Sequence, residues 1–180
     1  MSDMIHFEVP LLGFCAYSGT GKTTLLKKLV PLLKKQGLGL AIIKHSHHDF
    51  EIDYPGKDSY ELRHAGAEQM LIVSQHRLAH IVEYHGRHEA PPLSEILPKL
   101  DTDNVNLVLV EGYRHECFPK IELHRPSLAK PLIYPDDKNV IAVASDEPLT
   151  PDEAMPTLLD LNNDSAIVDF ILGFVSPDGK

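Results

Sequence analysis

The residues best suited to chemistry lie at positions 16–23, where the sequence is AYSGTGKT. Gly19 and Gly21 allow the backbone to curl so that successive N–H groups face one anion. Lys22 would place its charge on the β- and γ-phosphates of a nucleotide, and the Thr23 hydroxyl would bind Mg²⁺. This is the pattern of a phosphate-binding loop with alanine in place of its first glycine. It predicts that seven consecutive residues hold the nucleotide: Ser18, Gly19, Thr20, Gly21, Lys22, Thr23 and Thr24.

Two carboxylates are candidate partners of that metal ion. Glu111 directly follows NLVLV, an apolar run that predicts a buried strand ending where the ion would sit. Asp49 closes a polar stretch after another predicted strand, where it would hold a metal-bound water or orient the attacking water. The alternative for each is a solvated or turn-capping acid. We therefore assign catalytic roles to Lys22 and Asp49, and metal binding to Thr23, Asp49 and Glu111.

Asp146 bears on the choice of base. A carboxylate can accept hydrogen bonds from N1–H and N2–H₂ of guanine together, whereas adenine offers no such pair of donors. The sequence lacks the usual Asn-Lys-x-Asp guanine motif, but ASD at 144–146 stands in the equivalent place, after a late strand. Asp146 is thus predicted to recognise guanine, which makes GTP the expected ligand. The alternative is an N-cap or turn acid before Pro148.

These side chains require a sheet whose strands end at one edge. Residues 11–16 predict a buried strand, and leucines spaced three and four apart predict a helix that ends at Gly37. A second strand at 38–44 completes a right-handed parallel unit. Pro31 should kink or divide the helix. The predicted class is α/β, a P-loop NTPase-type fold with a mostly parallel sheet flanked by helices. Further strands are predicted at 106–110, 120–124 and 139–144, and helices at 93–100, 152–161 and 164–174.

The middle of the chain has a different pattern. Residues 70–73 and 78–84 flank the polar tetrapeptide SQHR, which predicts an antiparallel hairpin extension. Such a hairpin would add an edge to the sheet, and an exposed edge invites pairing with a second chain; a covered edge is the alternative. The polar loop at 44–57 would face the same side as the phosphate loop, where a nucleotide-sensing switch would sit.

Length, charge and composition exclude several classes of protein. At 180 residues the chain suits one nucleotide-binding domain over 1–180. The net charge of −9 argues against a broad surface for nucleic acid or anionic membranes. Two cysteines cannot form a disulfide framework, and no run of 18 apolar residues or secretory signal is present. A cytoplasmic protein is expected.

Four segments together resemble the molybdopterin-guanine dinucleotide biosynthesis adaptor protein B (MobB) family over residues 11–146: AYSGTGKTTLL, KHSHHDFEIDYPGKDS, RHAGA and LVLVEGY. The resemblance implies a homodimeric GTP-binding protein with weak GTPase activity. It also implies an accessory role beside the enzyme that attaches GMP to molybdopterin, with molybdopterin as a further candidate ligand. By matching positions, residues 19–24 would hold phosphates and Mg²⁺, supported by Asp49 and Glu111. Residues from Pro148 onward match no motif.

Hydrolysis should be slow, because neither a glutamine that positions water nor an arginine finger is evident, and a finger contributes about 10³–10⁵ in rate. The protein is then at most a slow GTPase. Two other functions remain open. An ATP-dependent small-molecule kinase would need an arginine-bearing lid, for which Arg125-Pro126 is the one hint. A nickel- or zinc-delivering GTPase would use the tract formed by His45, His47 and His48.

Overall fold

The chain divides into two compact units by its internal contacts. The computed structural model describes residues 3–46, 49–150 and 154–176. The main unit comprises Met1–His45 and Pro92–Lys180, and the inserted unit comprises Ser46–Pro91. The phosphate loop lies in the main unit. The expectation of one domain over 1–180 stays a prediction.

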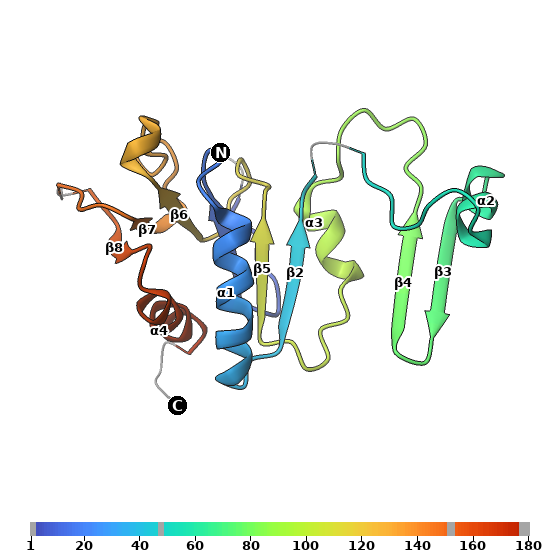
Figure 1. The fold of residues 1–180 in the computed structure, drawn as a ribbon, viewed down its shortest axis with the longest axis horizontal. Coiled ribbons are helices and arrows are strands. Elements are labelled where there is room, and N and C mark those ends of the chain that lie inside the picture. Colours follow the sequence, from blue (N-terminus) through green and yellow to red (C-terminus); the bar gives the residue numbers. More distant parts are fainter. Residues whose placement is uncertain (1–2, 47–48, 151–153, 177–180) are drawn as a thin grey trace. The chain divides into compact units, whose positions relative to one another are not determined.

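A parallel sheet forms the centre of the main unit (Figure 1). Within the described residues it has six strands in the order β2-β5-β1-β6-β7-β8, and every neighbouring pair is parallel. The carboxyl ends of all six strands therefore lie at one edge, as the site requires. The strands are β1 (Leu11–Cys15), β2 (Leu40–Lys44), β5 (Leu107–Glu111), β6 (Lys120–His124), β7 (Val140–Ser145) and β8 (Thr157–Asp160).

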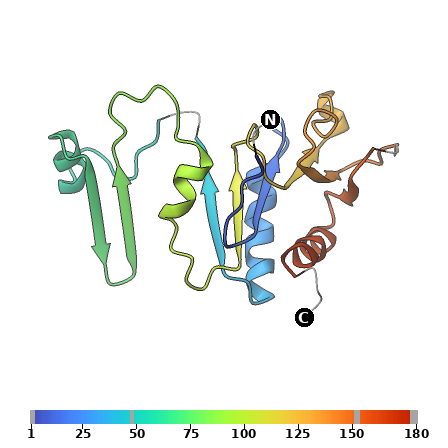
Figure 2. The same cartoon turned by 180° about the vertical axis from the view of Figure 1, so that it is seen from behind.

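Helices cover both faces of this sheet, as Figures 1 and 2 show from opposite sides. Helices α1 (Lys22–Lys35) and α4 (Asp164–Val175) pack on one face. On the other face lie α3 (Leu93–Ile96) and the short 3₁₀ helix η1 (Leu97–Lys99), and a second 3₁₀ helix, η2 (Pro126–Leu128), follows β6. The α/β class predicted from the sequence is confirmed. Helix α1 runs undivided through Pro31.

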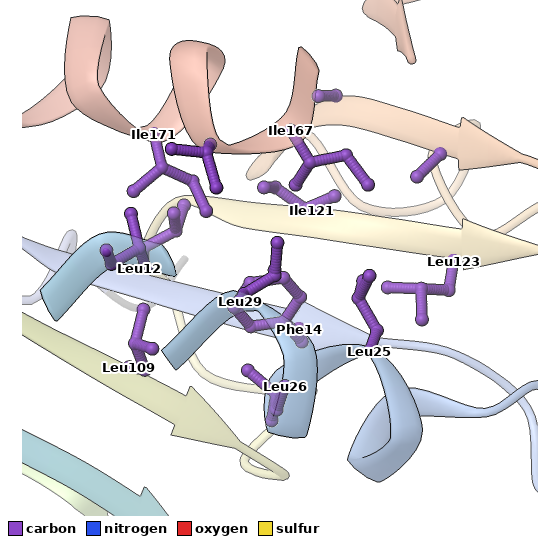
Figure 3. Close-up of a cluster of buried hydrophobic side chains, with 14 of the residues drawn as sticks. Leu12, Phe14, Leu25, Leu26, Leu29, Leu109, Ile121, Leu123, Ile167 and Ile171 are labelled. Carbon is purple, nitrogen blue, oxygen red and sulfur yellow. The ribbon is translucent and has the colours of Figure 1, made fainter. Parts of the chain in front are cut away.

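The alternation of side chains along the strands creates two hydrophobic layers. In β1, Leu12 and Phe14 point to the α1 and α4 side, whereas Leu11 points to the α3 side. Figure 3 shows the first layer, in which Leu29 of α1 and Ile167 of α4 meet these strand residues. All of these side chains are almost completely buried. No helix among the described residues has the length and apolar character that crossing a bilayer requires.

The prediction of a helix at 152–161 is wrong. Residues Thr157–Asp160 form strand β8, which pairs in parallel with β7 from Ala142 to Ser145. Residues 151–153 lie outside the described ranges. A strand of four residues is too short to show its own hydrophobic period, so its conformation depends on the neighbouring strand.

The inserted unit contains the predicted hairpin. Strands β3 (Gln69–Ser74) and β4 (Arg77–Val82) pair antiparallel, and α2 (Asp58–His64) precedes them. The hairpin forms a separate two-stranded sheet rather than an edge of the parallel sheet. None of the three buried hydrophobic clusters found among the described residues includes a residue of 46–91.

An arginine with three carboxylate partners joins the parts of the inserted unit. Arg63 of α2 is 8% exposed, and its guanidinium donates to Glu51 at 2.7 Å, Asp53 at 2.5 Å and Glu83 at 2.6 Å. A hydrogen bond from Ser59 lowers the pKa of Asp53, and the neighbouring Arg63 lowers it further. Charge pairing therefore connects the segment at 51–53, α2 and the residue after β4.

A glycine at the start of β2 is required by close packing of the backbone. A Cβ atom on Gly39 would lie 1.6 Å from the carbonyl oxygen of Asn104. We expect Gly39→Ala to lower the free energy of unfolding by about 3 kcal/mol, because a main-chain clash forces the strand to shift. Urea denaturation monitored by circular dichroism measures the change. Gly173→Ala in α4 is the matched control: no atom lies within 4 Å, and the helix should gain up to about 1 kcal/mol. Equal stability of the two variants would contradict this account.

Candidate functional site

The predicted phosphate loop connects β1 to α1 and is fixed from within. Gly19 and Gly21 have φ angles of 84° and 102°, in the left-handed region that other residues rarely adopt. Thr20 is 3% exposed, and its hydroxyl donates to the carbonyl of Tyr17 at 2.8 Å. Ser18 and Thr24, in contrast, are exposed. The sequence therefore builds a closed turn whose outer surface is open to a ligand.

The start of α1 and Lys22 give this loop its positive character. No side chain caps the first turn of α1, and that turn contains no acidic residue. Its N–H groups and the positive end of the helix dipole are thus available to an anion. The Lys22 ammonium donates to the carbonyl oxygen of Ala16 at 3.1 Å, which holds the charge across the loop. This arrangement fits a nucleotide phosphate chain.

Two of the three predicted metal ligands meet beside the loop. The Thr23 hydroxyl donates to Oε1 of Glu111 at 3.3 Å, because β1 and β5 are neighbours and pair Phe14 with Glu111. Hydroxyl and carboxylate oxygens are the ligands that Mg²⁺ prefers, so this donor set fits the ion. Lys44, for which the sequence predicts no role, pairs with Oε2 of Glu111 at 3.2 Å. A divalent ion at Glu111 would compete with this ammonium group.

The segment after β2 is anchored to the end of β5. His45 donates its backbone N–H to the carbonyl of Glu111 at 2.8 Å, and its ring stacks on Tyr113 with centroids 4.6 Å apart. Gly112 permits this approach: a Cβ atom there would lie 2.6 Å from Cβ of His45. The second residue of the predicted switch loop at 44–57 therefore touches the strand that delivers the Glu111 carboxylate.

The other predicted ligands of this loop stay predictions. Asp49 belongs to the inserted unit, and its expected roles in catalysis and metal binding are not tested by the geometry of the main unit. His47 and His48 lie outside the described residues. Among the residues that the structure does describe, no group of three or more His, Cys, Asp or Glu side chains could hold a metal ion.

Asp146, the predicted guanine ligand, is tied to the phosphate loop by Arg125. The Nη1 atom of Arg125 donates to Oδ2 of Asp146, and its Nε donates to the carbonyl of Thr20 at 2.9 Å. The buried Oδ1 of Asp146 has no hydrogen-bond partner in the described part of the chain. Burial lowers the pKa of the adjacent His124, although the charge of Asp146 opposes that effect. Arg125 is thus part of the site.

In the sequence, Arg125 is no more than a hint of a kinase lid. The available signal was its position directly after a predicted strand, β6, which places it at the same edge as the loop. What the sequence could not provide is the strand order, in which β6 lies between β1 and β7. That order brings the ends of the three strands together.

Two cavities adjoin these residues. One of about 430 Å³ is lined by Asp146, Glu147, Leu158 and Asn162 among others, and the amide of Asn162 donates to the backbone carbonyl of Asp146 at 3.3 Å. The other, of about 700 Å³, reaches Tyr17 of the phosphate loop. Both volumes are in the range of small-molecule sites. Asp146, the predicted guanine ligand, lines the first of them.

Known proteins are similar to this chain in sequence and in fold. The profile of the family described as molybdopterin guanine dinucleotide synthesis protein B matches residues 11–146. The chain is 48% identical over 165 residues to the molybdopterin-guanine dinucleotide biosynthesis adapter protein of Escherichia coli (strain K12), covering 91% of this chain and 92% of that protein. The adapter protein of Haemophilus influenzae is 42% identical over 165 residues, with 91% and 88% covered. A crystal structure of molybdopterin-guanine biosynthesis protein B matches at 25% identity with a TM-score of 0.69, covering 91% of this chain and 98% of that one.

Proposed function

The chain belongs to the molybdopterin guanine dinucleotide synthesis protein B family of adapter proteins, and from this premise we propose that it binds GTP with Mg²⁺ and hydrolyses it slowly. The observation that carries the proposal is the anion cradle between β1 and α1. Left-handed Gly19 and Gly21, the uncapped helix start and the Lys22 ammonium converge on one place. A structural turn has no need of this combination.

In the proposed complex each group has one task. The N–H groups of residues 19–24 bind phosphate oxygens, and Lys22 exchanges the Ala16 carbonyl for the β- and γ-phosphates. Thr23 and Glu111 would hold Mg²⁺, which supplies charge neutralisation on the phosphates when bound. Asp146 accepts hydrogen bonds from guanine, and Asp49 orients the attacking water. Because hydrolysis is slow, the protein acts as a switch before it acts as a catalyst.

Family membership supports a proposal about the partners. We propose that the protein works beside the enzyme that transfers GMP in molybdopterin guanine dinucleotide synthesis, as a homodimer, with molybdopterin as a further ligand. The nucleotide would set the conformation of the 44–57 segment. Support comes from the contact of His45 with the backbone of Glu111, which joins the start of that segment to the proposed metal site.

Isothermal titration with GTP, GDP and ATP, each with and without Mg²⁺, tests the proposal. We expect GTP to bind at least tenfold more tightly than ATP, and Mg²⁺ to strengthen GTP binding more than GDP binding, since the ion would neutralise the larger negative charge of the triphosphate. A preference for ATP with acceptor-dependent release of ADP would instead indicate the small-molecule kinase. Stoichiometric nickel or zinc binding that His47→Ala/His48→Ala removes would indicate the metal-delivering GTPase.

A further inference from the structure

The guanidinium of Arg125 makes contact with both halves of the proposed nucleotide site. Its Nε is bound to the carbonyl of Thr20 in the phosphate loop, and its Nη1 to the Asp146 carboxylate. The third nitrogen, Nη2, lies 3.9 Å from the position that a Cβ atom on Gly21 would take. Gly21 is the residue from which α1 starts. The cation is therefore beside the anion cradle while its charge is paired with Asp146.

This pairing sets up a competition for one carboxylate. Oδ2 of Asp146 accepts from Arg125 and Oδ1 is buried, so guanine can pair with both oxygens only if the carboxylate turns away from Arg125. The side chain of Asp146 is 16% exposed and that of Arg125 is 35% exposed, so the arginine is the more accessible partner. A base that donates two hydrogen bonds to Asp146 would weaken its bond with Arg125. The Nε bond to Thr20 would still hold the guanidinium next to the loop.

We propose that Arg125 is a phosphate-binding residue whose guanidinium is kept from the phosphates by its ion pair with Asp146. When guanine binds the Asp146 carboxylate, the guanidinium is free to bind the triphosphate. The inference rests on the proposed function, because it takes Asp146 as the guanine ligand. It adds a coupling between the two ends of the nucleotide: recognition of the base supplies a second cation to the phosphates. ATP lacks the paired donors and would leave Arg125 bound to Asp146.

Inorganic tripolyphosphate separates this mechanism from a structural role, because it has phosphates but no base. Asp146→Asn removes the negative charge that holds Arg125, so we expect this variant to bind tripolyphosphate about tenfold more tightly than the unaltered protein. The gain should vanish in Asp146→Asn/Arg125→Ala. Asp103→Asn is the control for charge, since Asp103 is exposed and lies before β5, at the opposite edge of the sheet. Unchanged or weaker tripolyphosphate binding by Asp146→Asn would overturn the inference.

Arg125→Ala gives a second, independent comparison. We expect it to weaken GTP binding about tenfold and to change tripolyphosphate binding of the otherwise unaltered protein less than twofold. An equal loss for both ligands would mean that Arg125 only braces the loop, and would also overturn the inference. If Arg125→Ala fails to fold, as a thermal melt would show, the Asp146→Asn measurement still decides. Absence of GTP binding to the unaltered protein would refute the proposed function but not the release of Arg125 by Asp146→Asn.

Discussion

Lys22→Ala is expected to weaken GTP binding by about two orders of magnitude. The ammonium lies across the phosphate loop at 3.1 Å from the Ala16 carbonyl and is the charge closest to where the β- and γ-phosphates would bind. Charge-assisted hydrogen bonds of this kind contribute about 1.5–3 kcal/mol, and about 1.4 kcal/mol corresponds to a factor of ten. Isothermal titration measures the loss, which should be larger for GTP than for GDP and smallest for GMP.

Lys27→Ala is the matched control, since it removes the same charge from an exposed position of the same helix. It should leave GTP affinity within about twofold, because surface charges are screened over roughly 8–10 Å of salt solution. If Lys22→Ala binds GTP as tightly as Lys27→Ala does, the phosphate loop does not have the role assigned to it. A loss that is equal for GTP and GMP would likewise contradict a contact with the terminal phosphates.

Lys120→Met should lower the free energy of unfolding strongly. Lys120 at the start of β6 is 1% exposed, and its ammonium donates to the carbonyl of Glu116 at 2.6 Å and to Asp137 at 2.9 Å. Methionine keeps the length of the side chain but leaves both acceptors without their cation. Removing one partner of a buried ion pair costs about 3–5 kcal/mol; because Asp137 is partly exposed, we expect about 3 kcal/mol. Chemical denaturation measures it.

The effect of Lys120→Met should depend on pH. Burial alone would raise the pKa of Asp137, but hydrogen bonds from Lys120 and Asn139 outweigh it, so the pKa is lowered on folding. The pair therefore stabilises the fold above the unfolded pKa of about 4, and this contribution is lost as the pH falls through the folded pKa. The difference in free energy of unfolding between the variant and the unaltered protein should be largest at pH 7 and should decrease in acid. Lys138→Met, at an exposed neighbour, should cost less than about 0.5 kcal/mol. A difference in free energy of unfolding that increases in acid would contradict the role of the ion pair.

The parts of the site that could be predicted from the sequence are those set by local rules. The order strand, glycine-rich turn, helix is a local property, and the phosphate loop follows it. Glu111 was predicted to lie beside Thr23 because an apolar strand followed by an acid ends at the same edge, and the two side chains are in contact. The antiparallel hairpin was likewise visible in its two apolar runs around a polar turn.

The parts that could not be predicted depend on which strands are neighbours. Arg125 reaches the phosphate loop because β6 pairs with β1, and Asp146 reaches Arg125 because β7 pairs with β6. No local pattern specifies that order. The same reason explains the error at β8, whose four residues are a strand only because β7 offers its edge. Lys44 was overlooked because a lysine at a strand end is common and its partner is 67 positions away.

Arg63 and its carboxylates imply that the two units respond to their solution differently. The main unit is stabilised by apolar layers, whose side chains do not titrate, whereas the inserted unit has no such layer among its described residues. Among its described residues, opposite charges around the buried Arg63 connect its parts, and acid removes this attraction by protonating the carboxylates. Lowering the pH should therefore loosen the segment at 51–53 while the apolar layers of the main unit stay intact.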